Sequence, residues 1–256
     1  MKIKLTSFTL LFLFTVVLNN RSAFAQICGP GGTLVGMYDF TGDGTANDKL
    51  YNQTTRLVVV TATGACSYIQ LDPGWVLLSG GVADVNGIAG REILVNRTTG
   101  IRIWSPRTGS LADYILGTNW QVLTGGISNM DAFAGAEIAV NYGTGIKVIT
   151  ARTGTISDYA NLGTSWSLLS GGISELDGIA GNEITINVGF NIKIITHRIA
   201  NIFTYNIGLG GFWNLCRIAN LDGVAGNEVQ VSNFSQTKTV IHRTRTIKTG
   251  TGNCVF

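Results

Sequence analysis

The sequence is poor in residues that many enzymes and nucleic-acid-binding proteins use. Of its 256 residues only 13% are charged, two are histidines and three are prolines. Eighteen basic residues stand against fifteen acidic ones, far from the basic excess that binding to nucleic acid or an anionic membrane requires. The apolar stretch at 5–18 is about 14 residues long, whereas a membrane-spanning helix needs about 20. These deficits argue against a nucleic-acid-binding protein and against a spanning helix.

The first 25 residues have the features of a secretory signal. Lys2 and Lys4 precede the apolar stretch, and Ala23-Phe24-Ala25 fits a small-residue cleavage site. We expect cleavage after Ala25, a mature chain of residues 26–256, and a location that is secreted, periplasmic or at the cell surface. Because Lys2, Lys4 and Arg21 leave with the signal, the mature chain has fifteen residues of each charge.

Glycine is abundant, with 34 residues, and a repeated motif contains many of them. The motif reads LDGIAGNEITIN at 176–187, VNGIAGREILVN at 85–96, MDAFAGAEIAVN at 130–141 and LDGVAGNEVQVS at 221–232. Its glutamates, spaced by 45, 46 and 45 residues, are Glu92, Glu137, Glu183 and Glu228. A fixed period of this size is typical of solenoids, propellers and repeat arrays.

Each repeat predicts four short strands and no helix. In one repeat, residues 166–170 form a first strand, and residues 183–187 alternate polar and apolar side chains as a half-buried strand does. The runs 192–196 and 201–205 complete the unit. Four strands in about 45 residues are the signature of a propeller blade, so we predict an all-β fold, a five-bladed β-propeller of four-stranded antiparallel blades. The blades are expected at about 32–74, 75–119, 120–165, 166–210 and 211–256.

The cysteines predict how such a ring closes. Cys28 and Cys254 both map by register to the linker between consecutive blades, where the last blade of a ring meets the first. We therefore predict a Cys28–Cys254 disulfide, which an oxidising compartment permits. Cys66 aligns with apolar residues and is interpreted as a buried small hydrophobe. Cys216 takes a glycine position near the axis and is not expected to pair with Cys66.

The repeated loop resembles the FG-GAP repeat, the propeller blade of integrin α subunits and of many bacterial secreted proteins. The resemblance covers the whole mature chain and implies a calcium-binding loop between the first two strands of a blade. The first two ligand positions are partly kept, as Asp84 and Asn86, Asn129 and Asp131, Glu175 and Asp177, and Asn220 and Asp222. The last position is kept as the four glutamates.

The middle ligand position of these loops is apolar. It holds Ile88, Phe133, Ile179 and Val224. Because calcium needs about six oxygens or more, we favour a loop in which an apolar plug has replaced the metal. The Asp and Asn side chains would then cap turn amides, and the glutamates would bond loop N–H groups. The alternative is a metal site.

The loop of blade one is the one candidate for calcium. Asp39 and Asp43 stand at the first and middle positions, and Asp48 lies near the last. One extra residue before Asp48 and Thr41 at the second position depart from the pattern, so calcium and its absence both remain open here. No cofactor is required by the remaining sequence.

Aromatic residues recur at equal positions and have two interpretations. They are Trp75, Trp120, Trp166 and Trp213 before the first strands, and Tyr68, Tyr114, Tyr159 and Tyr205 in the last strands. They either form sugar-stacking pockets, as in propeller lectins, or fill the space between blades, which we favour for rings at strict repeat positions. Trp104 has no counterpart and is the better candidate for an exposed contact.

Arginines also keep the register, near the hairpin between the last two strands. These are Arg107, Arg152, Arg198 and Arg243, with His197 and His242 directly before the last two. We favour a solvated rim over a ring of guanidinium groups for acidic glycans.

Function is less constrained by the sequence than fold. Both histidines and all the paired carboxylates sit at repeat positions, and one active site would break that symmetry, so no catalytic residue is identified. We expect a non-catalytic extracellular recognition module that binds a glycan or a cell-surface protein through a propeller face. The alternatives are a secreted glycosidase or lyase with carboxylates around a central channel, and a structural assembly module.

Overall fold

The structure is a computed structural model, and it describes residues 31–163, 165–208, 213–233, 235–252 and 254. The expected signal segment 1–25 and Cys28 lie outside these residues. No helix in the described part of the chain is long and apolar enough to cross a membrane.

Twenty strands form five four-stranded antiparallel sheets, each taken from one continuous stretch of chain. Each sheet is a meander whose neighbouring strands are consecutive in sequence, which confirms the predicted all-β class and the five four-stranded blades. Blade one contains β1 (Thr33–Tyr38), β2 (Asp48–Asn52), β3 (Arg56–Val60) and β4 (Cys66–Gln70). Blade two contains β5 (Val76–Ala83), β6 (Glu92–Arg97), β7 (Gly100–Trp104) and β8 (Leu111–Ile115).

The other three blades repeat this plan. Blade three contains β9 (Gln121–Ser128), β10 (Glu137–Asn141), β11 (Ile146–Thr150) and β12 (Thr155–Tyr159). Blade four contains β13 (Trp166–Ser174), β14 (Glu183–Val188), β15 (Asn191–Thr196) and β16 (Asn201–Asn206), with a short 3-10 turn η1 (His197–Ile199). Blade five contains β17 (Asn214–Ala219), β18 (Glu228–Ser232), β19 (Gln236–Ile241) and β20 (Thr246–Thr251).

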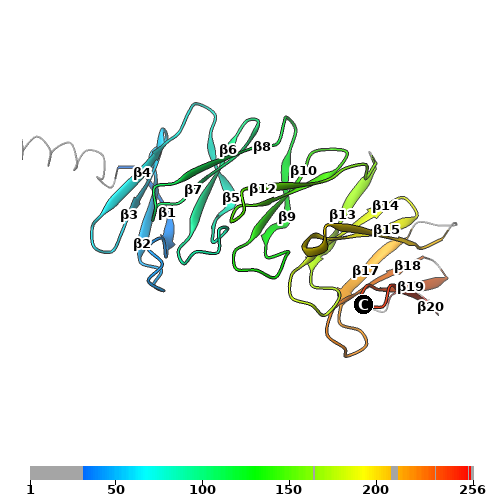
Figure 1. Cartoon of the computed structure of the whole chain (residues 1–256). Coiled ribbons are helices and arrows are strands. Elements are labelled where there is room, and N and C mark those ends of the chain that lie inside the picture. The colour runs from blue at the N-terminus through cyan, green and yellow to red at the C-terminus, as the bar shows by residue number, and fades with distance from the viewer. Residues whose placement is uncertain (1–30, 164, 209–212, 234, 253, 255–256) are drawn as a thin grey trace, which may run out of the picture.

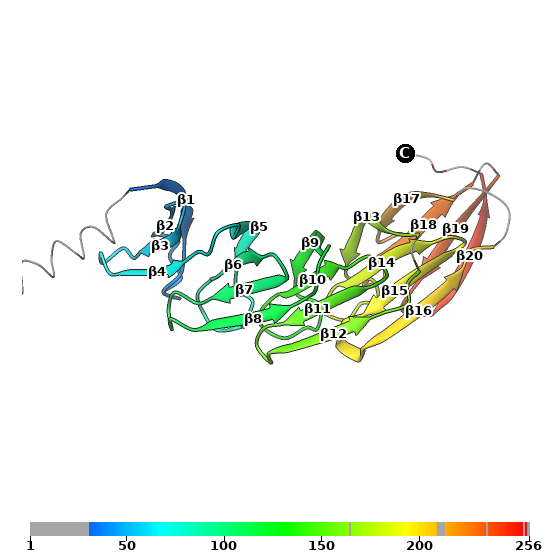
Figure 2. The ribbon, with the colours of Figure 1, turned by 90° about the horizontal axis from the view of Figure 1, so that it is seen from above.

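The blades follow one another in a curved row in Figures 1 and 2, with β1–β4 at one end and β17–β20 at the other. The first strands of neighbouring blades contact each other, β5 with β9, β9 with β13 and β13 with β17. A glycine pair interrupts β5, β9 and β13. At Gly81 an added Cβ would lie 2.7 Å from the carbonyl oxygen of Leu78 and 2.8 Å from that of Leu94, so no larger residue fits this crowded bulge.

The core lies in the seams between blades. One cluster joins Leu57 and Ile69 of blade one to Ile93, Val95 and Trp104 of blade two, and three further clusters fill the following seams. The second strand of each blade is central in its sheet and flanked by neighbouring blades, and its apolar residues are almost fully buried. A blade therefore cannot bury its apolar face without its neighbours, as in other repeat architectures.

The cysteines correct the predicted ring closure. Cys254 forms a disulfide with Cys216, not with Cys28, at a Cα–Cα distance of 5.6 Å. Register placed Cys254 in an interblade linker, but it could not show that the chain after β20 returns to β17 of its own blade. Cys66 is also disulfide-bonded, so its interpretation as a simple buried hydrophobe is wrong. Each terminal blade thus carries a disulfide, and the 38-residue separation of Cys216 and Cys254 ties the first strand of blade five to its last.

Candidate binding site

The glutamates of the repeated motif organise the loops between the first two strands of blades two to five. All four are at least 97% buried. One carboxylate oxygen of each accepts the backbone N–H that opens the loop, from Val85, Met130, Leu176 or Leu221, at 2.7–3.1 Å. In blade one, Asp48 accepts the N–H of Phe40 in the same way.

In three blades an arginine of the same blade occupies the loop. The Arg198 guanidinium donates through Nη1 to Glu183, at 2.6 Å, and through Nη2 to Asp177. Arg152 bridges Glu137 and Asp131, and Arg243 bridges Glu228 and Asp222, in the same geometry. The expected solvated rim of arginines is therefore wrong for these blades, because the guanidinium groups lie inside the loops as the cations between two carboxylates.

Blade two has a different arrangement. Its second loop position holds Asn86, and the Asn86 side-chain amide donates to Glu92 at 2.7 Å. Arg107, the counterpart of Arg198, instead donates through Nη1 to the carbonyl oxygen of Ala89 at 2.6 Å and is exposed. Burial raises the pKa of Glu92, and its N–H donors offset part of this rise.

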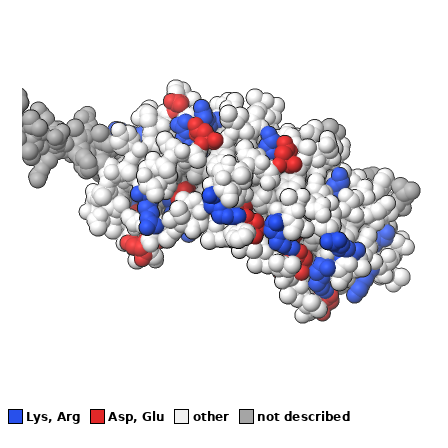
Figure 3. Space-filling view, viewed as in Figure 1, with Lys and Arg blue, Asp and Glu red and all other residues white. Residues whose placement is uncertain are grey.

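The apolar residues of these loops are not plugs. Their exposed fractions are 53% for Ile88, 65% for Phe133, 56% for Ile179 and 53% for Val224. The expectation of an apolar plug is therefore wrong. In blades three to five an arginine from the third-to-fourth-strand hairpin takes the interior of the loop. In blade two the Asn86 amide bonds the buried Glu92 instead. We call these four residues the loop rim. Figure 3 shows a row of basic and acidic side chains along the lower edge of this face and smaller mixed groups near its upper edge, with uncharged surface between them.

Backbone contacts stack the loops. The N–H groups of Arg91, Ala136, Asn182 and Asn227 each donate to the loop of the preceding blade, at 2.8–3.0 Å. Gly87 and Gly178 lie so close to the next loop that an added Cβ would be 2.4 and 2.7 Å from its carbonyl oxygens. The repeated glycines thus serve loop stacking, which places the loops that carry the rim residues next to one another along the blades.

The acidic loops were tested for calcium by their hydrogen bonds. Among the described residues, Glu175, Asp177 and Glu183 are the three acids whose oxygens lie within 4.8 Å of one another. Arg198 already donates to two of them, so a calcium ion would have to displace a guanidinium group. These residues therefore do not fit calcium in the arrangement seen.

The predicted calcium ligands of blade one are also engaged. The Asp39 carboxylate accepts the N–H groups of Gly42, Asp43 and Gly44, and Asp48 accepts those of Phe40, Thr41 and Ala62. Asp43 accepts from Thr45, which lowers its pKa. Carboxylates that accept this many N–H donors have few lone pairs left for a cation. Calcium at Asp39, Asp43 and Asp48 stays a prediction.

Most of the candidate sugar-stacking rings lie between blades. Tyr114, Tyr159 and Tyr205 are buried, as are Trp75 and Trp120, while Trp166 and Trp213 are partly buried. Trp104, expected to make an exposed contact, is 97% buried in the seam between blades one and two. Its lack of counterparts reflects the larger space in that seam, not a ligand.

Tyr68 does not occupy the position that its spacing predicts. In blades two to four, the buried tyrosine pairs with Ile101, Ile146 or Ile192, thirteen residues earlier. In blade one the equivalent Leu57 pairs with Ile69, only twelve residues later. A hairpin one residue shorter moves each side chain to the other face, so Ile69 enters the seam and Tyr68 is 47% exposed.

The two histidines fill the seams before blades four and five. Tyr205 and Thr196 of blade four bond the two ring nitrogens of His242 in blade five, at 2.7 and 2.9 Å. His197 meets Tyr159 and Thr150 in the same way, at 2.8 and 3.1 Å. Burial, followed by nearby arginine charge, lowers the pKa of His242 to about 4, and burial lowers the pKa of His197. Both rings are neutral parts of the seams.

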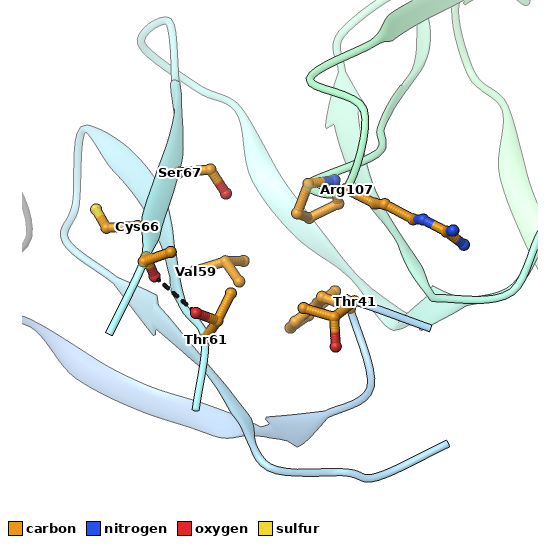
Figure 4. Close-up of a pocket in the computed structure, with 9 residues that line it drawn as sticks. Thr41, Val59, Thr61, Cys66, Ser67 and Arg107 are labelled. Carbon is orange, nitrogen blue, oxygen red and sulfur yellow. Dashed lines mark hydrogen bonds between the residues drawn. The ribbon is translucent and has the colours of Figure 1, made fainter. Parts of the chain in front are cut away.

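The seam between blades one and two contains a cavity of about 280 Å³ (Figure 4). Its lining combines residues of blade one with two residues of the β7–β8 hairpin: Phe40, Thr41, Val59, Thr61, Ala65, Cys66, Ser67, Pro106 and Arg107. Figure 4 shows the Ser67 hydroxyl directed into the space between β4 and that hairpin, while the Arg107 side chain leads away from it. The repeat pattern did not predict this cavity, because the cavity arises where the residues at two positions differ from those of the later repeats.

Comparisons with known proteins assign no activity to this chain. No protein-family model matches the chain. No curated protein matches its sequence either. A streptogramin B lyase structure matches at 14% identity and a TM-score of 0.38, over 86% of this chain and 69% of that one. The extracellular domain of a putative hybrid two component system from B. thetaiotaomicron matches at 12% identity and 0.39, over 90% and 38% of the two chains.

A third solved structure is an auxiliary nutrient binding protein from Bacteroides thetaiotaomicron, at 8% identity and a TM-score of 0.37. The match covers 86% of this chain and 57% of that one. The chain therefore spans well under two thirds of two of these three structures. The likeness is in the type of fold and assigns no substrate or partner to this chain.

Proposed function

We propose that this protein is a secreted, non-catalytic recognition module that binds a protein partner along the loop rim. The supporting observation is that four successive loops each present one exposed apolar side chain, Ile88, Phe133, Ile179 or Val224. Single exposed apolar residues are ordinary, but equivalent ones on four stacked loops form a strip, which is typical of an interaction surface.

A catalytic function is less well supported by the same loops. The buried carboxylates that an enzyme would use are held by arginines in three blades and by backbone N–H groups in all five. A carbohydrate partner is also less well supported, because most of the candidate stacking rings lie inside the seams. The loop rim remains as the surface with the chemistry of a protein contact.

The test uses residues 26–256 on an array of glycans and displayed peptides, with calcium and with chelator. We expect selected peptides to bind under both conditions. Replacing all four rim residues by serine should abolish this binding, because it removes the apolar contact while leaving the arginines in place.

The matched control replaces Ile115 and Phe190, exposed apolar residues at the opposite ends of the strands, by serine. This variant should bind as the unaltered protein does. Binding that survives the rim substitutions, or strong chelator-sensitive glycan binding in their presence, would reject the rim as the recognition surface.

A further inference from the structure

The four seams between blades follow one plan with three positions. The first position is a residue with a hydroxyl group at the end of the third strand of one blade. The second position is a residue on the fourth strand of the same blade. The third position belongs to the next blade and directly precedes the repeated arginine of that blade. The first position holds Thr61, Ser105, Thr150 and Thr196 in chain order, the second Ile69, Tyr114, Tyr159 and Tyr205, and the third Pro106, Ala151, His197 and His242.

The last seam shows what this space accepts. The His242 ring bonds the hydroxyls of Thr196 and Tyr205, and its centroid lies 5.0 Å from that of Phe203, edge to face. Phe203 pairs with Ile194 across the β15–β16 hairpin. An aromatic ring with two hydrogen-bonding atoms is therefore a native occupant of the position.

The seam between blades one and two has the same walls without the ring. Val59 and Ser67 pair across β3 and β4 as Ile194 and Phe203 do across β15 and β16. Thr61 stands where Thr196 does, and Pro106 replaces the histidine. Thr61, Val59, Ser67 and Pro106 all line the cavity. The cavity is the empty ring position of this seam (Figure 4).

The chemistry of the lining suits a small ring. Phe40, Val59 and Pro106 supply apolar walls, and the hydroxyls of Thr61 and Ser67 supply polar contacts. The Thr61 hydroxyl bonds Thr63 at 2.9 Å and the carbonyl oxygen of Ala65 at 3.2 Å, so one of its lone pairs can still accept from a ligand. A volume of about 280 Å³ is just below the range for pockets that hold drug-sized ligands, which starts at about 300 Å³, so the cavity suits a smaller ligand.

We propose that this cavity binds a small polar aromatic ring of the imidazole or phenol class, in the place that histidine fills in the last two seams. The ring would lie between Val59 and Pro106 and bond the hydroxyls of Thr61 and Ser67. This site is independent of the partner proposed for the loop rim. A ligand of about six heavy atoms is expected to bind with a Kd of about 1 mM, and a larger ligand that carries such a ring more tightly.

The experiment titrates 4-methylimidazole and p-cresol into methyl-labelled protein, with cyclohexanol as a non-aromatic control. The Val59 methyl resonances should shift saturably with the two aromatic compounds and not with cyclohexanol. A His242→Ala variant serves as the positive control, because it opens the same ring position in the last seam.

Two substitutions at one residue separate binding from stability. Pro106→His supplies the missing ring from the protein and should weaken binding at least about tenfold while keeping or raising the melting temperature. Pro106→Ala copies Ala151 of the next blade and should retain binding. Should Pro106→His not fold, Ser67→Phe fills the cavity from the other wall, as Phe203 does in blade four.

The outcomes are distinct. Saturable shifts that Pro106→His or Ser67→Phe removes and Pro106→Ala retains would establish the site. Binding to His242→Ala without binding to the unaltered protein would overturn the proposal, as would equal affinities for the Pro106→His and Pro106→Ala variants. The four-fold rim variant should keep ring binding, so a failure of the rim proposal leaves this result unchanged.

Discussion

Replacing Arg198 by methionine tests whether the arginines hold the loops together. The side chain keeps most of its length but loses the charge that bridges Asp177 and Glu183. Glu183 is fully buried and the Asp177 side chain is 12% exposed, so the substitution leaves one buried and one partly buried carboxylate without their cation. Removing one partner of a buried ion pair costs about 3–5 kcal/mol, and partial exposure of the guanidinium places the expected loss near about 3 kcal/mol.

The matched control is Arg107→Met, at the repeat position where the arginine donates to the Ala89 carbonyl oxygen and bridges no carboxylates of its loop. Urea unfolding followed by tryptophan fluorescence should give a loss within about 0.5 kcal/mol for this exposed residue. For a chain of this size, a loss of about 3 kcal/mol corresponds to a drop in melting temperature of roughly 6–12 °C.

A second-site substitution makes the test specific to charge. Adding Glu183→Gln to Arg198→Met should recover part of the lost stability, because an amide is cheaper to bury than an unpaired carboxylate. Equal losses for Arg198→Met and Arg107→Met would refute the bridging role. So would a Glu183→Gln substitution that is additive with Arg198→Met.

Three further predictions concern other parts of the blades. Because the pKa of His242 is about 4 in the folded protein, the unfolded chain binds a proton at this ring at a higher pH than the folded chain does. The free energy of unfolding should therefore be highest above pH 6.5 and fall by about 3 kcal/mol as the pH drops to about 4. An equally steep fall in a His242→Gln variant would contradict this. Replacing Cys216 and Cys254 by serine should lower stability by about 4 kcal/mol for a separation of 38 residues, and non-reducing peptide mapping should recover these two cysteines in one linked fragment. Gly178→Ala should destabilise the protein by about 1–2 kcal/mol more than Gly223→Ala does. Both glycines have positive φ, but only at Gly178 would a Cβ meet the next loop. Equal losses in thermal unfolding would show that the loops do not touch.

The fold was predictable because single residues recur at a fixed spacing of about 45 residues, which gives the length of one blade. The glutamate spacing located the blades, and alternation in runs such as Glu183–Asn187 located the second strands, whose apolar residues are buried as expected. These features depend only on local sequence. Each blade repeats them, so an error in one copy is corrected by the others.

The contents of the loops were not predictable in the same way. The sequence showed the acids at the ligand positions and an apolar residue in the middle of the loop, but the cation comes from an arginine 15 residues after the glutamate, across a hairpin. Arg198 and Glu183 keep equal register whether the arginine faces solvent or enters the loop. One observation could have separated the two: the loop with Asn86 in place of the second acid is also the loop that its arginine does not enter.

Two predictions that rested on aligning the repeats residue by residue were wrong. Tyr68 keeps a spacing of 46 residues to Tyr114, yet the shorter β3–β4 hairpin places Ile69 in the seam instead. Cys254 was placed in the segment after the last strand, but its disulfide partner was predicted wrongly. The alignment of the repeats does not show which strand the chain lies against after its last hairpin. Both errors occur in terminal blades, where only one neighbour constrains the geometry.

The residues that break the repeat are more informative about binding than those that obey it. A side chain that recurs at the same position is explained by packing, as Glu183 is in four blades and Tyr205 in three. The seam between blades one and two has Ile69 where the next three seams have tyrosine and Pro106 where the last two have histidine, and it contains a cavity of about 280 Å³. Its two causes are independent, a deletion in the β3–β4 hairpin and Pro106 in the next blade, so the vacancy is better explained by an external occupant than by a single imperfect repeat.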